Sequence, residues 1–201
     1  MSKKKIVEVL ALMDRSGSMS GIIHEAVNAF NTFIDEQKKT NIDDTVIVTL
    51  ASFDNSYEIV FDRININELP KLTVEQVLPR GMTALNDAIG KLVNGAKHPK
   101  RPTVLLIQTD GHENASQEFT TPAIKALIEQ KQKDGWDVNF IGAGLSKFEV
   151  ETQATMRGVL LGKAVAFQAN AEGMENLKTY YSNTTATYRS VVSAETKSEV
   201  N

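Results

Sequence analysis

The sequence has 201 residues, of which 41% are hydrophobic and 23% charged, proportions typical of one soluble globular domain. Its 22 Lys and Arg against 25 Asp and Glu leave a net charge of −3, so no overall positive field would recruit nucleic acid or an acidic membrane. The absence of cysteine excludes a disulfide framework, a thiolate metal site and a cysteine nucleophile.

The apolar stretch Ile6–Met13 follows lysines, as the hydrophobic part of a signal peptide would. Glu8 interrupts this stretch, and no small-residue cleavage site follows it. No apolar run approaches the roughly 20 residues that are needed to span a bilayer. We therefore expect an intracellular protein.

In the first half of the chain, the spacing of apolar residues predicts three strands and a helix. The near-continuous apolar run Ile6–Met13 is typical of a strand covered on both faces. A helix is expected to begin near Ser20, because apolar residues recur at helical spacing from residue 23 to residue 34. Strand Thr45–Phe53 and a partner at Tyr57–Phe61 are separated by a short polar turn, which predicts an antiparallel hairpin whose second strand lies at a sheet edge.

In the second half, helices and strands are predicted to alternate. The expected helices are Ala84–Ala96, one capped by Thr121, Lys147–Arg157 and one that follows Asn170, and the expected strands are Thr103–Thr109, Trp136–Ile141 and Val165–Phe167. Residues 1–192 are predicted to form a single domain, and residues 193–201 a disordered C-terminal tail.

This alternation predicts a doubly wound α/β fold, with a mostly parallel sheet, one antiparallel edge strand and helices on both faces. In such sheets, ligands bind outside the carboxyl ends of the strands. Asp14 and Asp110 each follow a strand at that edge, and Thr83 lies in a loop just before a helix. We therefore expect these three side chains to lie close together.

The segment from Asp14 to Ser18 places one carboxylate and two hydroxyls, those of Ser16 and Ser18, at alternate positions of a tight turn. Oxygen ligands of this kind suit a hard cation such as Mg²⁺, which is held at about 2.1 Å and keeps several waters. A simple strand-to-helix turn with a serine cap would also explain the segment, but it would explain neither Thr83 nor Asp110. The sequence therefore predicts a metal site with these five residues as ligands.

Three segments of the chain together resemble the von Willebrand factor A (VWA) domain family over about residues 5–190. They are Asp14-x-Ser16-x-Ser18, Gly81-x-Thr83 and Thr109-Asp110-Gly111. In that family such residues build the metal-ion-dependent adhesion site (MIDAS). The resemblance implies that Ser16, Ser18 and Thr83 ligate the metal through their hydroxyls, whereas Asp14 and Asp110 act mostly through bridging waters. It also implies an intact site, because all five positions are present.

The resemblance further implies that the last coordination position is filled by an Asp or Glu of a protein partner, and that the chain binds rather than catalyses. Mg²⁺ is the expected ion, with Mn²⁺ and Ca²⁺ as alternatives. Residues that flank the site are expected to form the rim that contacts the partner: Arg15, Met19, Met82, His112 and Glu113. Surface roles explain Arg15 and Met19 equally well, and a solvated loop position explains His112 and Glu113 better than a role in tuning the site. In relatives the last helix shifts when ligand binds, which makes residues 171–192 the candidate moving element here.

The layout is similar to that of small single-domain members in bacteria and phages, which implies a cytoplasmic or virion location. The partner would then belong to a larger assembly, such as an ATPase ring or a virion. Two other functions stay open. A metal-dependent phosphoryl-transfer enzyme would use Asp14, but it would want a second Asp where Ser16 stands. A self-assembling structural subunit would form large oligomers.

Overall fold

The computed structural model describes residues 5–40, 42, 44–168 and 170–198. Within these residues, six strands form one sheet in the order β3-β2-β1-β4-β5-β6. The strands are β1 (Lys5–Asp14), β2 (Asp44–Phe53), β3 (Tyr57–Asn65), β4 (Thr103–Thr109), β5 (Asp137–Ala143) and β6 (Ala164–Phe167). All neighbouring strands are parallel except β2 and β3, which pair antiparallel. The predicted mostly parallel sheet with one antiparallel edge strand is confirmed.

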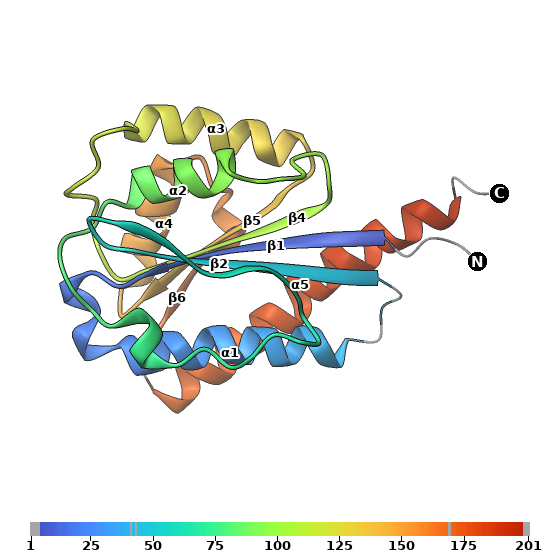
Figure 1. Cartoon of the computed structure of the whole chain (residues 1–201), viewed down its shortest axis with the longest axis horizontal. Helices are drawn as coiled ribbons and strands as arrows, with labels where there is room; N and C mark the ends of the chain where they lie inside the picture. Colours follow the sequence, from blue (N-terminus) through green and yellow to red (C-terminus); the bar gives the residue numbers. More distant parts are fainter. Residues whose placement is uncertain (1–4, 41, 43, 169, 199–201) are drawn as a thin grey trace.

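Helices cover both faces of the sheet, as Figure 1 shows. Helices α1 (Ile23–Lys39) and α5 (Ala171–Ser198) lie on one face. Helices α2 (Leu85–Asn94), α3 (Thr121–Lys133) and α4 (Lys147–Met156) lie on the other. The doubly wound arrangement predicted from the sequence is therefore present. No helix among the described residues is both long enough and apolar enough to cross a membrane.

The central strand β1 explains why its sequence is apolar at nearly every position. Successive side chains of a strand point to opposite faces of the sheet. Val9 and Ala11 pack into the core beneath α1 and α5, whereas Leu10 and Leu12 pack into the core beneath α2, α3 and α4. The strand thus has two buried faces, and its carboxyl end delivers Asp14 to the edge of the sheet.

Several element boundaries differ from the predicted ones. A short 3₁₀ turn, Gly17–Gly21, precedes α1, so the α-helix begins at Ile23 rather than near Ser20. The cap of α3 is Thr120, whose hydroxyl accepts from the backbone N–H of Ala123 at 3.3 Å, rather than Thr121. Each shift reflects local backbone geometry that the spacing of apolar residues does not encode.

The last helix, α5, begins where predicted. The side chain of Asn170 accepts a hydrogen bond from the backbone N–H of Gly173 at 2.8 Å, which is the expected helix cap. The helix continues to Ser198, so helical structure occupies much of the segment 193–201, for which the sequence predicts a disordered tail. Residues 199–201 lie outside the described part of the chain.

Candidate metal centre

The carboxyl ends of β1 and β4 bring the first residues of the site together. Asp14, the last residue of β1, is fully buried. Its Oδ2 accepts a hydrogen bond from the Thr109 hydroxyl, at the end of β4, at 2.5 Å. Its Oδ1 accepts from the backbone N–H of Ser16 at 2.7 Å. Both oxygens are therefore fixed, and the turn after β1 is fixed with them.

A row of oxygen atoms continues from this turn toward the loop after β4. The hydroxyls of Ser16 and Ser18 lie 3.1 Å apart. The Ser18 hydroxyl donates to Oδ1 of Asp110 at 2.9 Å. Ser18 is thus within hydrogen-bond reach of both Ser16 and Asp110, although Asp110 lies 92 residues later in the sequence.

Thr83 completes the group. Its side chain is buried, and its backbone N–H donates to Oδ1 of Asn114 at 2.9 Å. A Cβ placed on Gly111 would lie 3.5 Å from the Thr83 hydroxyl oxygen and 3.7 Å from that of Ser18, so both hydroxyls face the same small space beside this glycine. The structure therefore brings together all five residues that the sequence singled out as metal ligands.

The electrostatics of this group favour a cation. The pKa of Asp14 is raised to about 6, mainly by burial and to a smaller extent by the neighbouring Asp110 charge, against the opposing effect of the hydrogen bonds from Thr109 and Ser16. Burial also raises the pKa of Asp110. The hydrogen bonds given above to both carboxylates come from neutral donors, so negative charge accumulates in a poorly solvated space.

The donor set fits a hard divalent ion. Within the described residues, no group of three or more His, Cys, Asp or Glu side chains is placed to hold a metal. Any cation bound at this edge would therefore need the hydroxyl oxygens of Ser16, Ser18 and Thr83 beside the carboxylates. Oxygen-only sites of this kind suit Mg²⁺, Mn²⁺ or Ca²⁺.

The raised pKa of Asp14 leads to a prediction for the metal-free protein. The folded pKa of about 6 exceeds the ordinary value of 3.8, so between pH 7 and pH 5 the folded state binds more protons than the unfolded state. Lowering the pH over this range should therefore add about 1 kcal/mol to the free energy of unfolding. Urea unfolding in EDTA at both pH values would measure the gain, and Asp14→Asn should lack it. An equal gain in Asp14→Asn would contradict the attribution of this pH dependence to protonation of Asp14.

The hairpin between β2 and β3 also holds the site. Asp54 follows β2 and is buried, and its Oδ2 accepts from Arg15 at 3.0 Å and from Arg80 at 2.7 Å. Glu58, on β3, pairs with the same two arginines at 2.7 Å each. Arg15 belongs to the first metal-site segment and Arg80 directly precedes the second, so this cluster joins the two segments through the hairpin.

Backbone contacts reinforce the same connection. The N–H of Arg80 donates to the carbonyl of Arg15 at 2.8 Å, and that of Gly17 donates to the carbonyl of Gly81 at 3.1 Å. Gly81 has φ 68°, and a Cβ there would lie 2.3 Å from Oδ1 of Asn55, which accepts from the backbone N–H of Met82 at 2.7 Å. Only glycine permits this close approach of the hairpin to the Thr83 loop.

The predicted rim residues do not all lie at the surface. Arg15 and Met19 are buried, so the prediction that they contact a partner is wrong for this structure. Arg15 is held by Asp54 and Glu58, and Met19 packs in the core beneath α1. The two acidic partners that bury Arg15 lie about 40 residues later in the sequence, so no local pattern reveals them.

The other three rim residues are at least partly accessible. Met82 is 52% exposed, and His112 is also exposed, with its Nδ1 2.5 Å from Nε2 of Gln153 on α4. Glu113 is partly exposed, but its carboxylate accepts hydrogen bonds from the backbone N–H groups of Asn86 and Ser116 at 2.7 Å each. Glu113 therefore organises its loop, whereas Met82 and His112 remain candidates for partner contact.

Comparisons with known proteins support the fold. No family model matches the sequence, and no curated protein sequence matches it either. The vWF domain of the type V pili tip protein Mfa5 from Porphyromonas gingivalis is similar in structure, with a TM-score of 0.64 and 11% identity over 89% of this chain and 95% of that one. A von Willebrand factor type A protein from Catenulispora acidiphila has a TM-score of 0.60 and 16% identity, over 90% of this chain and 43% of that one.

A third similar structure carries a metal. Proximal thread matrix protein 1 from the mussel byssus, with a zinc-occupied MIDAS motif, has a TM-score of 0.60 and 16% identity over 89% of this chain and 46% of that one. The present chain spans less than half the length of the byssus and Catenulispora structures. At such low identity these likenesses show the fold alone, which is von Willebrand factor A-like.

Proposed function

We propose that the chain is a VWA-family protein-binding module that recognises an acidic side chain of a partner through a bound divalent cation. The observation that carries this proposal is the convergence of three hydroxyls and two carboxylates at the carboxyl edge of the sheet. Ser16, Ser18 and Thr83 would hold the ion through their hydroxyls. Asp14 and Asp110 would supply negative charge and orient those hydroxyls. A vWA-like neighbour with a zinc-occupied MIDAS motif supports divalent-metal binding, and we propose Mg²⁺ as the ion here.

The donor set explains why an acidic partner is favoured. A cation held mainly by neutral hydroxyls keeps much of its positive charge and attracts a carboxylate from outside. The partner's Asp or Glu would meet the ion at a partly dry edge, where charge-assisted contacts are stronger than in water. The exposed Met82 and His112 lie in the loops that carry Thr83 and Asp110, so they are placed to touch the residues around that carboxylate.

The environment of Asp14, the carboxylate at the end of β1, favours a binding function over phosphoryl transfer. Both oxygens of Asp14 already accept hydrogen bonds, and the side chain is fully buried, so neither oxygen faces a substrate. Ser16 occupies the position at which an acid two residues later would be needed. We therefore propose a non-enzymatic role, in keeping with structural neighbours that are named as pilus and byssus proteins.

We further propose that the module is an adaptor or component of a larger bacterial or phage assembly, in the cytoplasm or the virion. The similarity to a pilus tip protein supports a role in assembly, although it does not specify the partner. An ATPase ring and other virion proteins are the two classes of partner that this proposal includes.

Affinity capture from a lysate of the native source would test the proposal. The immobilised chain should retain a partner in Mg²⁺, lose it in EDTA, and fail to retain it as Asp110→Asn. The matched control is Asp134→Asn, which removes the same negative charge from the end of α3. Asp134 does not belong to any of the three metal-site segments, so this variant should retain the partner as the wild type does. A partner that is retained equally in EDTA and by Asp110→Asn would show that the interface lies elsewhere.

A further inference from the structure

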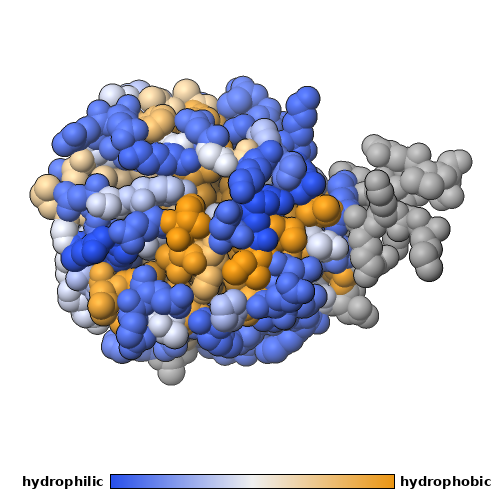
Figure 2. Space-filling view, viewed as in Figure 1, coloured by the Kyte–Doolittle hydropathy of each residue, from blue (hydrophilic) through white to orange (hydrophobic). Residues whose placement is uncertain are grey.

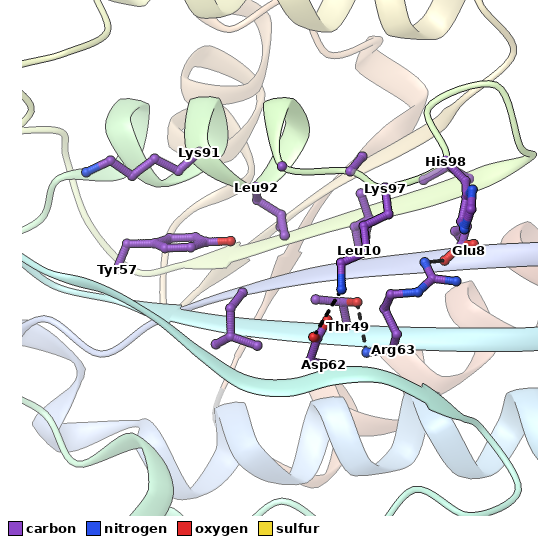
Figure 3. A pocket seen from close by; sticks show the side chains of 14 residues that line it. Glu8, Leu10, Thr49, Tyr57, Asp62, Arg63, Lys91, Leu92, Lys97 and His98 are labelled. Carbon is purple, nitrogen blue, oxygen red and sulfur yellow. Dashed lines mark hydrogen bonds and ion pairs between the residues drawn. The ribbon is translucent and has the colours of Figure 1, made fainter.

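A cavity of about 550 Å³ lies away from the metal centre. It is bounded by the C-terminal part of α2 and the turn after it, by β1 and β2, and by the edge strand β3 (Figure 3). Helix α2 packs over β1 and β2, and the cavity lies between the end of this helix and β3. Figure 2 shows hydrophobic residues gathered along the middle of the face that includes this edge.

One part of the cavity is apolar. Leu10 of β1 and Leu92 of α2 are buried at its base, and Ile59 of β3 is 46% exposed at its wall. The ring of Tyr57 lies along the same wall with its hydroxyl pointing into the cavity (Figure 3). Burial and the nearby Asp62 charge raise the pKa of Tyr57 to about 12, so this hydroxyl stays protonated and can donate a hydrogen bond.

The other part of the cavity is polar and carries an excess of positive charge. The buried carboxylate of Glu8 accepts from Arg63 at 2.8 Å and from Arg101 at 2.7 Å, so two cations face one anion. Lys97 and Asp62 approach each other at 3.4 Å, from the turn after α2 and from β3, and both side chains are 60% exposed. The charged residues that line the cavity sum to one positive charge: Glu8, Asp62, Arg63, Lys91 and Lys97. His98 stands beside Glu8 (Figure 3).

We propose that this cavity binds an amphipathic monoanion, meaning a small carboxylic acid with an aliphatic or aromatic body. The body would lie against Leu10, Ile59 and Leu92, and the carboxylate would exchange with Asp62 as the partner of Lys97. The cavity volume is within the range of small-molecule sites, which are mostly apolar with a few convergent polar groups.

The charges favour an anion over a cation. The buried carboxylate of Glu8 is already paired with two arginines and is not free to meet a cationic head. The net positive charge of the lining also attracts an anion and repels a cation. Lys97 and Asp62 are both largely exposed, so their mutual attraction is weak and easily replaced. The site is independent of the metal centre, because Glu8 lies in the first half of β1 whereas Asp14 lies at its last residue.

Calorimetric titration with decanoate, below its micelle concentration and in EDTA, would test this inference. The wild-type chain should bind one equivalent saturably, and decyltrimethylammonium, which has the same apolar chain and the opposite charge, should bind at least tenfold more weakly. The presence of Mg²⁺ should not change the decanoate affinity. Absence of saturable decanoate binding, or equal binding of the cationic amphiphile, would overturn the proposal.

Two variants locate the binding. Ala96→Phe would fill the cavity from the turn after α2 and should weaken decanoate binding at least tenfold. Lys97→Gln should weaken it about fivefold, which is what an exposed ion pair contributes. The matched control is Lys125→Gln on α3, whose side chain is also exposed and pairs with Glu129 at 3.9 Å, and it should leave the affinity unchanged. Unchanged affinity in both Ala96→Phe and Lys97→Gln, with normal melting curves, would place any bound decanoate elsewhere.

Discussion

Asp54→Ala is expected to lower the free energy of unfolding by about 3 kcal/mol, because it leaves the buried guanidinium of Arg15 without its buried counter-ion. Glu58 still pairs with Arg15, but the Glu58 side chain is 52% exposed and cannot replace the lost burial. Urea unfolding would measure the loss. The matched control, Glu129→Ala, breaks an exposed ion pair on α3 and should cost less than 1 kcal/mol. Equal losses in the two variants would contradict the role assigned to Asp54.

Loss of the Asp54 carboxylate should also affect metal binding, because Asp54 joins the segment of Ser16 and Ser18 to the segment of Thr83 through Arg15 and Arg80. Asp54→Asn preserves the size of the side chain and removes its charge. We expect it to remain folded but to bind Mg²⁺ more weakly than the wild type. Unchanged Mg²⁺ affinity in a destabilised Asp54→Asn protein would mean that the hairpin stabilises the fold without positioning the ligands.

Arg189→Met is expected to cost about 3–5 kcal/mol of stability. Arg189, on α5, is buried and pairs with both carboxylate oxygens of Asp44, at the start of β2, at 2.8 and 2.7 Å. It also donates to the carbonyl and the side-chain oxygen of Gln37 on α1 at 2.9 Å each. Its removal would leave Asp44 as an unpaired buried charge, and thermal or urea unfolding would report the loss.

A double variant shows whether this loss comes from the unpaired charge. Replacing both partners, as Asp44→Leu with Arg189→Met, should be less destabilising than Arg189→Met alone, because no buried charge remains. If the double variant is less stable than Arg189→Met alone, the Asp44–Arg189 ion pair makes a net stabilising contribution. The stability loss in Arg189→Met would then not come from leaving Asp44 buried without a partner.

The same contact bears on the hypothesis that α5 moves on ligand binding. Arg189 fastens the second half of the helix to α1 and β2, and Tyr181 packs edge-on against Phe33 of α1 with ring centroids 5.0 Å apart. Movement of the whole helix would require breaking a buried ion pair. We therefore expect partner binding to change hydrogen exchange less around Arg189 than at the first turn of α5, and uniform changes along the helix would contradict this.

The fold was predictable from the sequence because its strands and helices have strong local patterns. The apolar run Ile6–Met13 reflects the two buried faces of β1, and the polar turn after Phe53 marks the only antiparallel pair of the described sheet. Boundaries were less predictable. The 3₁₀ turn before α1 is closed by backbone hydrogen bonds, such as that from the N–H of Met19 to the carbonyl of Ser16 at 3.0 Å, which the spacing of apolar residues does not encode. The cap of α3 is Thr120 rather than Thr121, and the two adjacent hydroxyls are alike in the sequence.

The five side chains of the candidate metal centre were predictable from the sequence, but the ion pairs that connect its segments to the β2–β3 hairpin were not. Each of the five follows or precedes an element at one sheet edge, so topology alone brings them together. The hairpin residue Asp54 lies 39 residues from Arg15 in the sequence, and its turn had no feature beyond a hairpin signal. Arg15 was therefore expected at the surface, whereas its two acidic partners bury it.

Titration of Mg²⁺ into the chain by calorimetry tests the central claim most directly, with two serines of the same turn as a matched pair. Ser18 donates to Asp110 at 2.9 Å, whereas Ser20 donates to the carbonyl of Gly17 at 2.7 Å, and both are exposed. We predict one saturable Mg²⁺ site in the wild type, at least tenfold weaker binding in Ser18→Ala, and unchanged binding in Ser20→Ala. Absence of binding in the folded wild type, or equal affinities in the two variants, would contradict a hydroxyl-held cation at this edge.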